Sequence, residues 1–141
     1  MAERFSITMT DDDSEDQFLV RTVLDDLDYK IDFNTLNNGE ELVTHLEHEL
    51  TNGKNFPSLI LLDINMPKMN GLEFLKELRS DPELKHISVY MVTTSSDDSD
   101  VAGAYEYNVA GYILKPVDIA HFEGTFKLIT DFWRLCEFPK N

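Results

Sequence analysis

Residues 58–71, SLILLDINMPKMNG, hold the pattern that decides the fold. The first five of them form a short apolar run, which is typical of a strand buried on both faces of a parallel sheet. Asp63 follows this run directly, and Asn70 begins a segment with the spacing of a helix. A strand buried on both faces needs helices on two sides of its sheet, so this stretch predicts an α/β fold.

The rest of the chain repeats this alternation of strand and helix. Apolar or alternating segments predict five strands, at residues 5–10, 29–36, 58–62, 87–93 and 111–114. Apolar spacing and capping residues predict five helices, at residues 14–28, 38–52, 70–78, 98–108 and 118–136. Ser14 and Asn38 are the expected N-caps of the first two helices, because each has a Gln or Glu three residues later. The order (βα)₅ predicts a doubly wound, five-stranded parallel sheet with helices on both faces.

Composition narrows the classes of function. The chain has 141 residues, with 12 Lys and Arg against 27 Asp and Glu and a net charge of −15. This length predicts one domain over residues 1–141, and the charge argues against binding nucleic acid or an anionic membrane. Cys136 is the single cysteine, which excludes an intramolecular disulfide, and no uncharged stretch is long enough to span a bilayer. These features predict a cytoplasmic protein.

Polar or charged residues follow four of the five predicted strands. They are the acidic residues 11–13, Asp63, Thr93 and Lys115. In open parallel sheets the ligand site lies at the carboxyl ends of the strands, so these groups converge if strands one, three, four and five are neighbours. Singly, each residue is more often part of a turn or a solvated surface. All four at strand ends are much less easily explained by chance.

Converging carboxylates carry a specific chemical implication. Two carboxylates about 5 Å apart repel each other by roughly 3 kcal/mol at an effective dielectric constant near 20, so the site favours a bound cation. Oxygen ligands in a hydrated cluster suit Mg²⁺ or Mn²⁺ rather than zinc. A divalent ion, Lys115 and the Thr93 hydroxyl around Asp63 would form a site for phosphoryl transfer, with Asp63 as the nucleophile.

Over nearly its whole length the sequence resembles the receiver domain of bacterial two-component response regulators. The resemblance rests on the acidic pair Asp11-Asp12, on Asp63 in LLDINMPKMNG, on Thr93 in YMVTTSS and on Lys115 in GYILKPVD. It implies a flavodoxin-like receiver fold. It also implies that Asp63 accepts a phosphoryl group from a sensor histidine kinase, a hybrid kinase or a phosphotransfer protein.

The resemblance implies a role for each residue of the site. Asp12, Asp63 and the main-chain carbonyl of Asn65 would bind Mg²⁺ directly, and Asp11 would act through a water molecule. The further roles fall to residues of the last two strands: Thr93 would bond a phosphoryl oxygen, Lys115 would pair with the phosphoryl group, and Tyr112 would be an aromatic switch that follows Thr93. The Lys115–Pro116 peptide is commonly cis in the family.

The family also implies a surface for output. Phosphorylation would repack residues 98–108, the strand at 111–114 and the helix at 118–136, and this face would bind partners or form a homodimer. The resemblance implies a single receiver domain with no output domain, and the C-terminal sequence resembles small stand-alone regulators that work with phytochrome-type or hybrid kinases. Such a protein is no enzyme beyond its own phosphorylation and dephosphorylation. Phe132, Trp133 and Phe138 fit either core packing, expected for at least one of them, or an interface.

Three alternatives remain open from the residues alone. A magnesium-dependent phosphatase of the haloacid dehalogenase type usually has a second acid two residues after its nucleophile, where this chain has Asn65. A flavin binder would place a phosphate on the acidic loop at residues 11–16, which would repel it. A receiver that works without phosphorylation is the third. His45 and His48 could bind a metal, but a solvated helix face explains them better.

Overall fold

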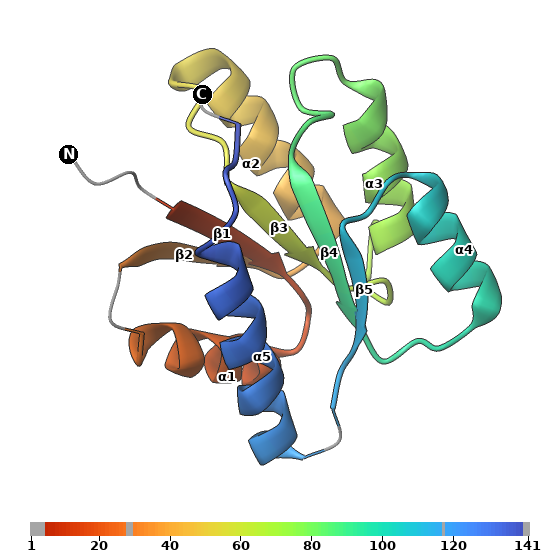
Figure 1. The fold of residues 1–141 in the computed structure, drawn as a ribbon. Helices are drawn as coiled ribbons and strands as arrows, with labels where there is room; N and C mark the ends of the chain where they lie inside the picture. The colour runs from red at the N-terminus through yellow and green to blue at the C-terminus, as the bar shows by residue number, and fades with distance from the viewer. Residues whose placement is uncertain (1–4, 28–29, 117, 140–141) are drawn as a thin grey trace.

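The computed structural model describes residues 5–27, 30–116 and 118–139, and it contains a single five-stranded parallel sheet (Figure 1). The order of the strands across the sheet is β2-β1-β3-β4-β5. The strands are β1 (Phe5–Thr10), β2 (Ile31–Leu36), β3 (Leu59–Leu62), β4 (Ser88–Thr93) and β5 (Gly111–Leu114). The helices are α1 (Ser14–Asp25), α2 (Gly39–Asn52), α3 (Gly71–Ser80), α4 (Asp98–Glu106) and α5 (Ile119–Trp133). The predicted (βα)₅ fold is therefore confirmed.

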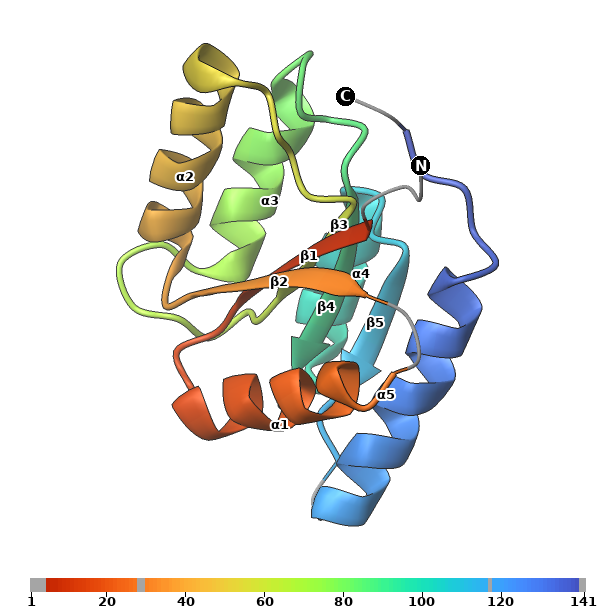
Figure 2. The same cartoon turned by 90° about the vertical axis from the view of Figure 1, so that its left-hand side faces the viewer.

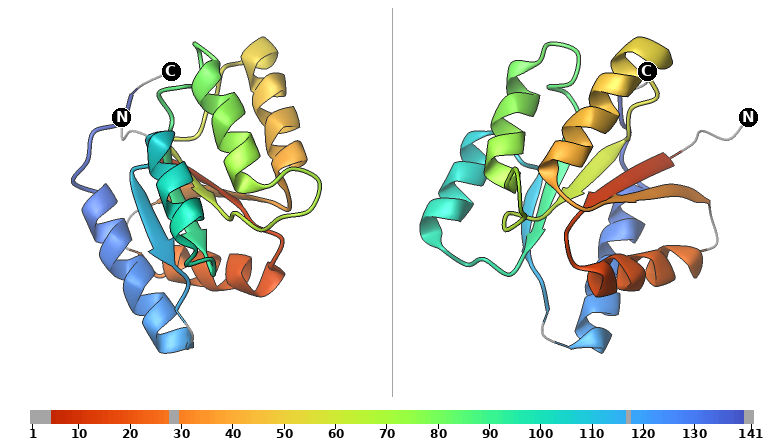
Figure 3. Two further views of the ribbon diagram at one scale, coloured as in Figure 1. Left: turned by 90° about the vertical axis from the view of Figure 1, so that its right-hand side faces the viewer. Right: turned by 180° about the vertical axis from the view of Figure 1, so that it is seen from behind.

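Helices cover both faces of the sheet and form two hydrophobic cores. Figures 2 and 3 show α1 and α5 on one face and α2, α3 and α4 on the other. The core under α1 and α5 contains Ile7, Met9, Phe126 and Trp133, and the core on the other face contains Phe74. Alternate residues of β3 enter different cores, and all four are buried, as its continuous apolar run predicts. No helix among the described residues has the length and apolar character needed to cross a membrane.

The strand order brings the carboxyl ends of β1, β3, β4 and β5 side by side. In the register of the sheet, Thr10 pairs with Leu62, the last residue of β3. Thr93 pairs with Leu114, at the last residues of β4 and β5. The chain builds the sheet outward from β1 in both directions, with β2 on one side and β3 on the other. The groups that follow β1, β3, β4 and β5 therefore meet at the carboxyl edge of the sheet.

The first helix starts differently from the prediction. Its N-cap is Asp13, whose side chain accepts hydrogen bonds from the main-chain N–H groups of Glu15 and Asp16 at 2.9 and 3.3 Å, so Ser14 is already helical. The expected capping box between Ser14 and Gln17 is therefore wrong. The Gln17 side chain instead donates to the carbonyl oxygens of Asp11 at 2.6 Å and Leu36 at 3.2 Å, which ties the loop after β1 to the end of β2.

Other boundaries shift by a few residues, and the C-terminal aromatic residues divide between core and surface. Helix α5 ends at Trp133 rather than at residue 136, and α1 ends at Asp25, while residues 28 and 29 of the predicted helix and strand lie outside the described part. Trp133 is buried against Tyr90, with ring centroids 5.3 Å apart, and Phe138 packs on Phe5 at 5.1 Å. Phe132 is exposed.

Candidate functional site

Asp63 is held at the end of β3 by its neighbours on both sides of the chain. Its main-chain N–H donates to the carbonyl oxygen of Thr10 at 3.1 Å, and the N–H of Gly71 donates to the carbonyl oxygen of Ile64 at 3.0 Å. Helix α3 therefore begins directly against the peptide that carries Asp63. The Asp63 side chain is 7% exposed, and its Oδ1 is buried without a hydrogen-bond partner. A buried carboxylate oxygen without a partner is unusual and is suited to an incoming ligand.

Asp11, Asp12 and Asp63 come together as the sequence predicts. One carboxylate oxygen from each lies within 4.8 Å of the others. Asp11 is buried, whereas Asp12 is exposed, so the cluster opens to solvent on one side. Burial raises the pKa of Asp11 to about 6, although hydrogen bonds from Lys115 and from the N–H of Asp13 oppose this shift.

The cluster has the donors that a hard divalent cation requires. The side-chain atoms that could bind a metal are all carboxylate oxygens, and Oδ1 of Asp63 is free to act as a ligand because it has no hydrogen-bond partner. These residues therefore fit Mg²⁺ or Mn²⁺. Asn65 is exposed on the loop two residues after Asp63, and a role for its carbonyl as a metal ligand stays a prediction.

Lys115 brings a positive charge into this acidic site. Its Nζ lies 2.7 Å from Asp11 Oδ2, 2.8 Å from Asp16 Oδ2 and 3.7 Å from Asp63 Oδ2, and its side chain is only 8% exposed. Burial lowers the pKa of Lys115, but the hydrogen bonds to Asp11 and Asp16 outweigh burial and hold it above its usual value. Lys115 is therefore charged throughout the physiological pH range.

Asp16 is a residue of the site that the sequence analysis missed. It lies in the first turn of α1, where an acidic residue is ordinarily explained by the helix dipole. The predicted start of this helix at residue 14 was a usable signal, because it places the first turn beside the carboxyl end of β1. Asp16 lies in that turn and is therefore near the site that contains Lys115.

The peptide that follows Lys115 corrects one expectation. The described residues contain no cis peptide bond, so the Lys115–Pro116 bond is trans. The expectation of a cis bond at this position is wrong for this structure. A trans bond is the more stable form even before proline, by about 0.5–1 kcal/mol.

Thr93, Ser95 and Tyr112 form a chain of hydrogen bonds beside the cluster. The buried Thr93 hydroxyl accepts a bond from the Ser95 N–H at 3.3 Å. The Tyr112 hydroxyl donates to the Ser95 carbonyl oxygen at 2.9 Å, and the Ser95 hydroxyl donates to Asp100 of α4 at 2.6 Å. A movement of Thr93 can therefore reach both Tyr112 and α4 through Ser95.

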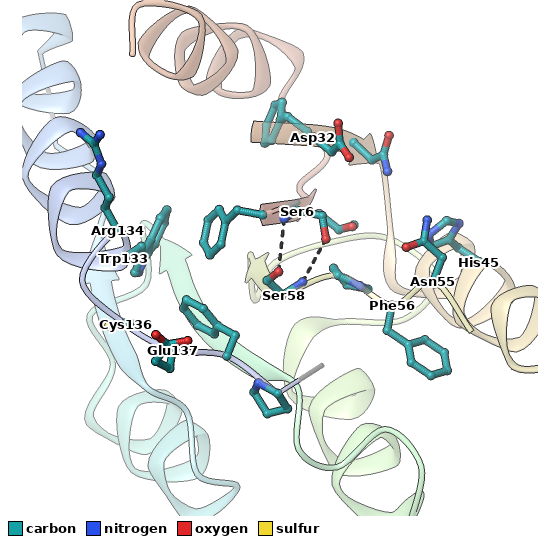
Figure 4. Close-up of a pocket in the computed structure, with 17 residues that line it drawn as sticks. Ser6, Asp32, His45, Asn55, Phe56, Ser58, Trp133, Arg134, Cys136 and Glu137 are labelled. Atoms are coloured by element: carbon teal, nitrogen blue, oxygen red, sulfur yellow. Dashed lines mark hydrogen bonds between the residues drawn. The ribbon is translucent and has the colours of Figure 1, made fainter. Parts of the chain in front are cut away.

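A hollow lies away from the acidic cluster, at the opposite edge of the sheet near the amino ends of the strands (Figure 4). Ser6 and Ser58 bond to each other there: each main-chain N–H donates to the other's hydroxyl, at 3.2 and 3.1 Å. His45 and Cys136 line this hollow, but neither belongs to a group of potential metal ligands among the described residues. On α2, His45 is partly buried and His48 is exposed, and the interpretation of the pair as part of a solvated helix face stays a prediction.

Comparisons with known proteins agree with this geometry. The model of the family described as "Response regulator receiver domain" matches residues 7–126. The chain is 33% identical over 129 residues to Response regulator Rcp1 of Synechocystis sp., covering 90% of this chain and 87% of that protein.

Solved structures show the same similarity in three dimensions. The crystal structure of the phosphorylated cyanobacterial phytochrome response regulator RcpA has a TM-score of 0.91 at 31% identity, over 98% of this chain and 100% of that one. The Mn²⁺-bound form of Rcp1 has a TM-score of 0.89 at 30% identity, over 96% of this chain and 99% of that one.

Proposed function

The chain belongs to the response regulator receiver family of two-component systems, and on that basis we propose that Asp63 is its phosphorylated residue. The observation that carries the proposal is the buried Oδ1 of Asp63, which has no partner, next to two further carboxylates and the Lys115 ammonium. A nucleophile must present a free oxygen to the phosphorus, and the charge that develops on the phosphoryl oxygens must be neutralised.

The transfer itself needs little from the protein beyond position and charge. An Asp63 carboxylate oxygen forms a bond to phosphorus while the bond from phosphorus to a histidine nitrogen of the donor breaks, and the leaving imidazole keeps the electron pair and takes up a proton. Lys115 would pair with the new phosphoryl group, a role that its distance of 3.7 Å from Asp63 Oδ2 supports, and the Thr93 hydroxyl would donate to one of the phosphoryl oxygens. Receiver domains bind Mg²⁺ or Mn²⁺ at an acidic pocket, and such an ion held by Asp11, Asp12, Asp63 and the Asn65 carbonyl would neutralise phosphoryl charge.

The response to phosphorylation is then a shift between two arrangements of the same residues. The Thr93 hydroxyl moves toward the phosphoryl group, and because the Ser95 N–H is bonded to it, the loop after β4 follows. Ser95 also holds the Tyr112 hydroxyl and Asp100, so the switch tyrosine and α4 change together. The phosphoryl group biases this equilibrium through its charge and its strong acceptor oxygens.

We expect acetyl phosphate with Mg²⁺ to add one phosphoryl group to the protein, and Asp63→Asn to abolish the addition. Intact-mass spectrometry measures the adduct directly, with a metal-free sample beside it. Asp25→Asn is the matched control, because it makes the same change at an exposed residue of α1. An adduct that survives Asp63→Asn would contradict the proposal, and so would a folded protein that gains none under conditions where hydrolysis is too slow to hide it. Turnover of an added phosphomonoester would favour the phosphatase instead.

Exposed apolar side chains support a partner-binding surface around α4, β5 and α5. Six of the seven large hydrophobic residues that are exposed in the described chain lie on α4, β5, α5 and the turn after it: Tyr105, Leu114, Ile119, Leu128, Phe132 and Leu135. Exposed apolar surface that is contiguous is typical of interaction sites. We propose this surface as the site for a partner or a second copy, and a sensor histidine kinase, hybrid kinase or phosphotransfer protein as the phosphodonor. The acidic, disulfide-free composition supports a cytoplasmic location.

Charging this surface is expected to weaken self-association. Leu128→Glu with Phe132→Glu places two carboxylates on each copy, and we expect at least about a tenfold weaker dimer of the phosphorylated protein. Analytical ultracentrifugation over a concentration series measures the change. Phe18→Glu is the control, because Phe18 is equally exposed but lies on α1. Equal effects of both sets of substitutions, or none, would contradict a dimer through this surface.

A further inference from the structure

The Asp16–Lys115 ion pair is not explained by the proposed phosphorylation of Asp63. Lys115 Nζ lies 2.8 Å from Asp16 Oδ2, within the range of a charge-assisted hydrogen bond, but 3.7 Å from Asp63 Oδ2. The latter distance is too long for a hydrogen bond. The ammonium is therefore bound to Asp11 and Asp16, and it only approaches the residue whose phosphoryl group it would serve.

The surroundings make this contact stronger than a surface salt bridge. The exposed fractions are 8% for the Lys115 side chain and 17% for that of Asp16, so water screens the pair only partly. Asp16 comes from the first turn of α1, on a different element from Asp11 and Asp63. Among the described residues, Lys115 forms ion pairs with Asp11, Asp16 and Asp63, whereas Glu15, the neighbour of Asp16 in the same turn, is exposed and forms none with it.

We propose that Asp16 is a positioning residue that competes with the phosphoryl group for the Lys115 ammonium and thereby weakens the phosphorylated state. The inference rests on the proposed function of Asp63. The Lys115 ammonium is held by two short ion pairs, at 2.7 Å to Asp11 and at 2.8 Å to Asp16. To bond the phosphoryl group closely, Lys115 must move toward Asp63 and lengthen its bond to Asp16. The free energy of that bond is lost from the phosphorylated state.

The expected consequence is a tighter and longer-lived phosphorylated state when Asp16 loses its charge. Asp16→Asn keeps the size of the side chain but replaces the carboxylate with a neutral amide. It also removes one negative charge near an incoming anion. We expect the affinity for beryllofluoride, an analogue of the phosphoryl group, to rise about fivefold in the presence of Mg²⁺. The phosphoryl group on Asp63 should turn over more slowly as Lys115 stays bound to it.

Two further variants separate competition from charge and from folding. Glu15→Gln removes the same charge one residue away, so it reports the long-range electrostatic effect alone. Asp16→Glu keeps the carboxylate on a longer side chain and should return the affinity toward that of the wild type. Titration followed by ¹⁹F NMR gives the affinities, and thermal unfolding of each variant shows whether α1 is intact. The ¹⁵Nζ resonance of Lys115 in the metal-free protein reports the contact itself, independently of phosphorylation.

The outcomes distinguish this inference from the proposal on which it rests. A rise in affinity in Asp16→Asn beyond that in Glu15→Gln, with a shifted Lys115 resonance, supports the competition. Equal affinities in these two variants, an unmoved resonance, or weaker binding in Asp16→Asn would overturn it, while phosphorylation of Asp63 in the wild type would still stand. Failure of the wild type to bind beryllofluoride or to accept a phosphoryl group would overturn both.

Discussion

Gly71→Ala is expected to lower the free energy of unfolding by about 1–3 kcal/mol and to slow phosphorylation of Asp63 by roughly a hundredfold. A Cβ atom on residue 71 would overlap the carbonyl oxygen of Asp63, and it would lie 3.0 Å from the carbonyl carbon and 3.1 Å from Ile64 Cα. These neighbours are main-chain atoms that carry the nucleophile, so they cannot move aside without moving Asp63. The glycine at the end of the segment at residues 58–71 is therefore required by close approach of two backbones.

Gly124→Ala provides the opposite expectation in the same protein. Gly124 lies within α5, and a Cβ there would have no neighbour within 4 Å. Alanine at this position should stabilise the helix by about 0.5–1 kcal/mol and leave phosphorylation unchanged. Thermal unfolding and the rate of phosphorylation by acetyl phosphate measure both variants. If Gly71→Ala retained the wild-type rate, the position of α3 against Asp63 would not matter for the reaction.

The fold was predictable because its signals are local and agree with one another. The buried run of β3, the alternation of strands and helices, and the Asn38 cap all point to one parallel sheet, and Asn38 does cap α2. The convergence of the strand ends depended on the strand order, which is a long-range property. Convergence could therefore be predicted only on the condition that the first, third, fourth and fifth strands are neighbours, and the order β2-β1-β3-β4-β5 satisfies that condition.

The details that could not be predicted are those in which similar side chains compete. Asp13 and Ser14 are both good N-cap residues, and only the path of the loop after β1 selects Asp13. The contact of Asp16 with Lys115 depends on two segments that are distant in the sequence, and so does the hydrogen bond from Tyr112 to Ser95. Spacing within one segment carries no information about such contacts.

Arg79→Met is expected to destabilise the protein by about 3 kcal/mol, which lowers the melting temperature by roughly 10 °C. Arg79, in the last turn of α3, donates to four main-chain carbonyl oxygens: Tyr107 at 2.7 Å, Lys85 and Ile87 at 2.8 Å, and Asn108 at 3.1 Å. It joins α3 to the loop before β4 and to the turn between α4 and β5. In that turn Asn108 has a φ of 60°, a left-handed conformation that is costly without support.

The guanidinium group explains why lysine should not replace this arginine. Its planar fork of donors reaches two separate segments at once, whereas an ammonium is a single point of charge. We therefore expect Arg79→Lys to recover less than half of the loss. The control is Arg21→Met, which removes the same charge from an exposed residue whose guanidinium lies 4.9 Å from the centre of the Phe33 ring, a contact worth about 0.5–1 kcal/mol. Urea unfolding of the three variants measures the differences. Equal stability of Arg79→Met and Arg21→Met would show that the four carbonyl groups do not depend on Arg79.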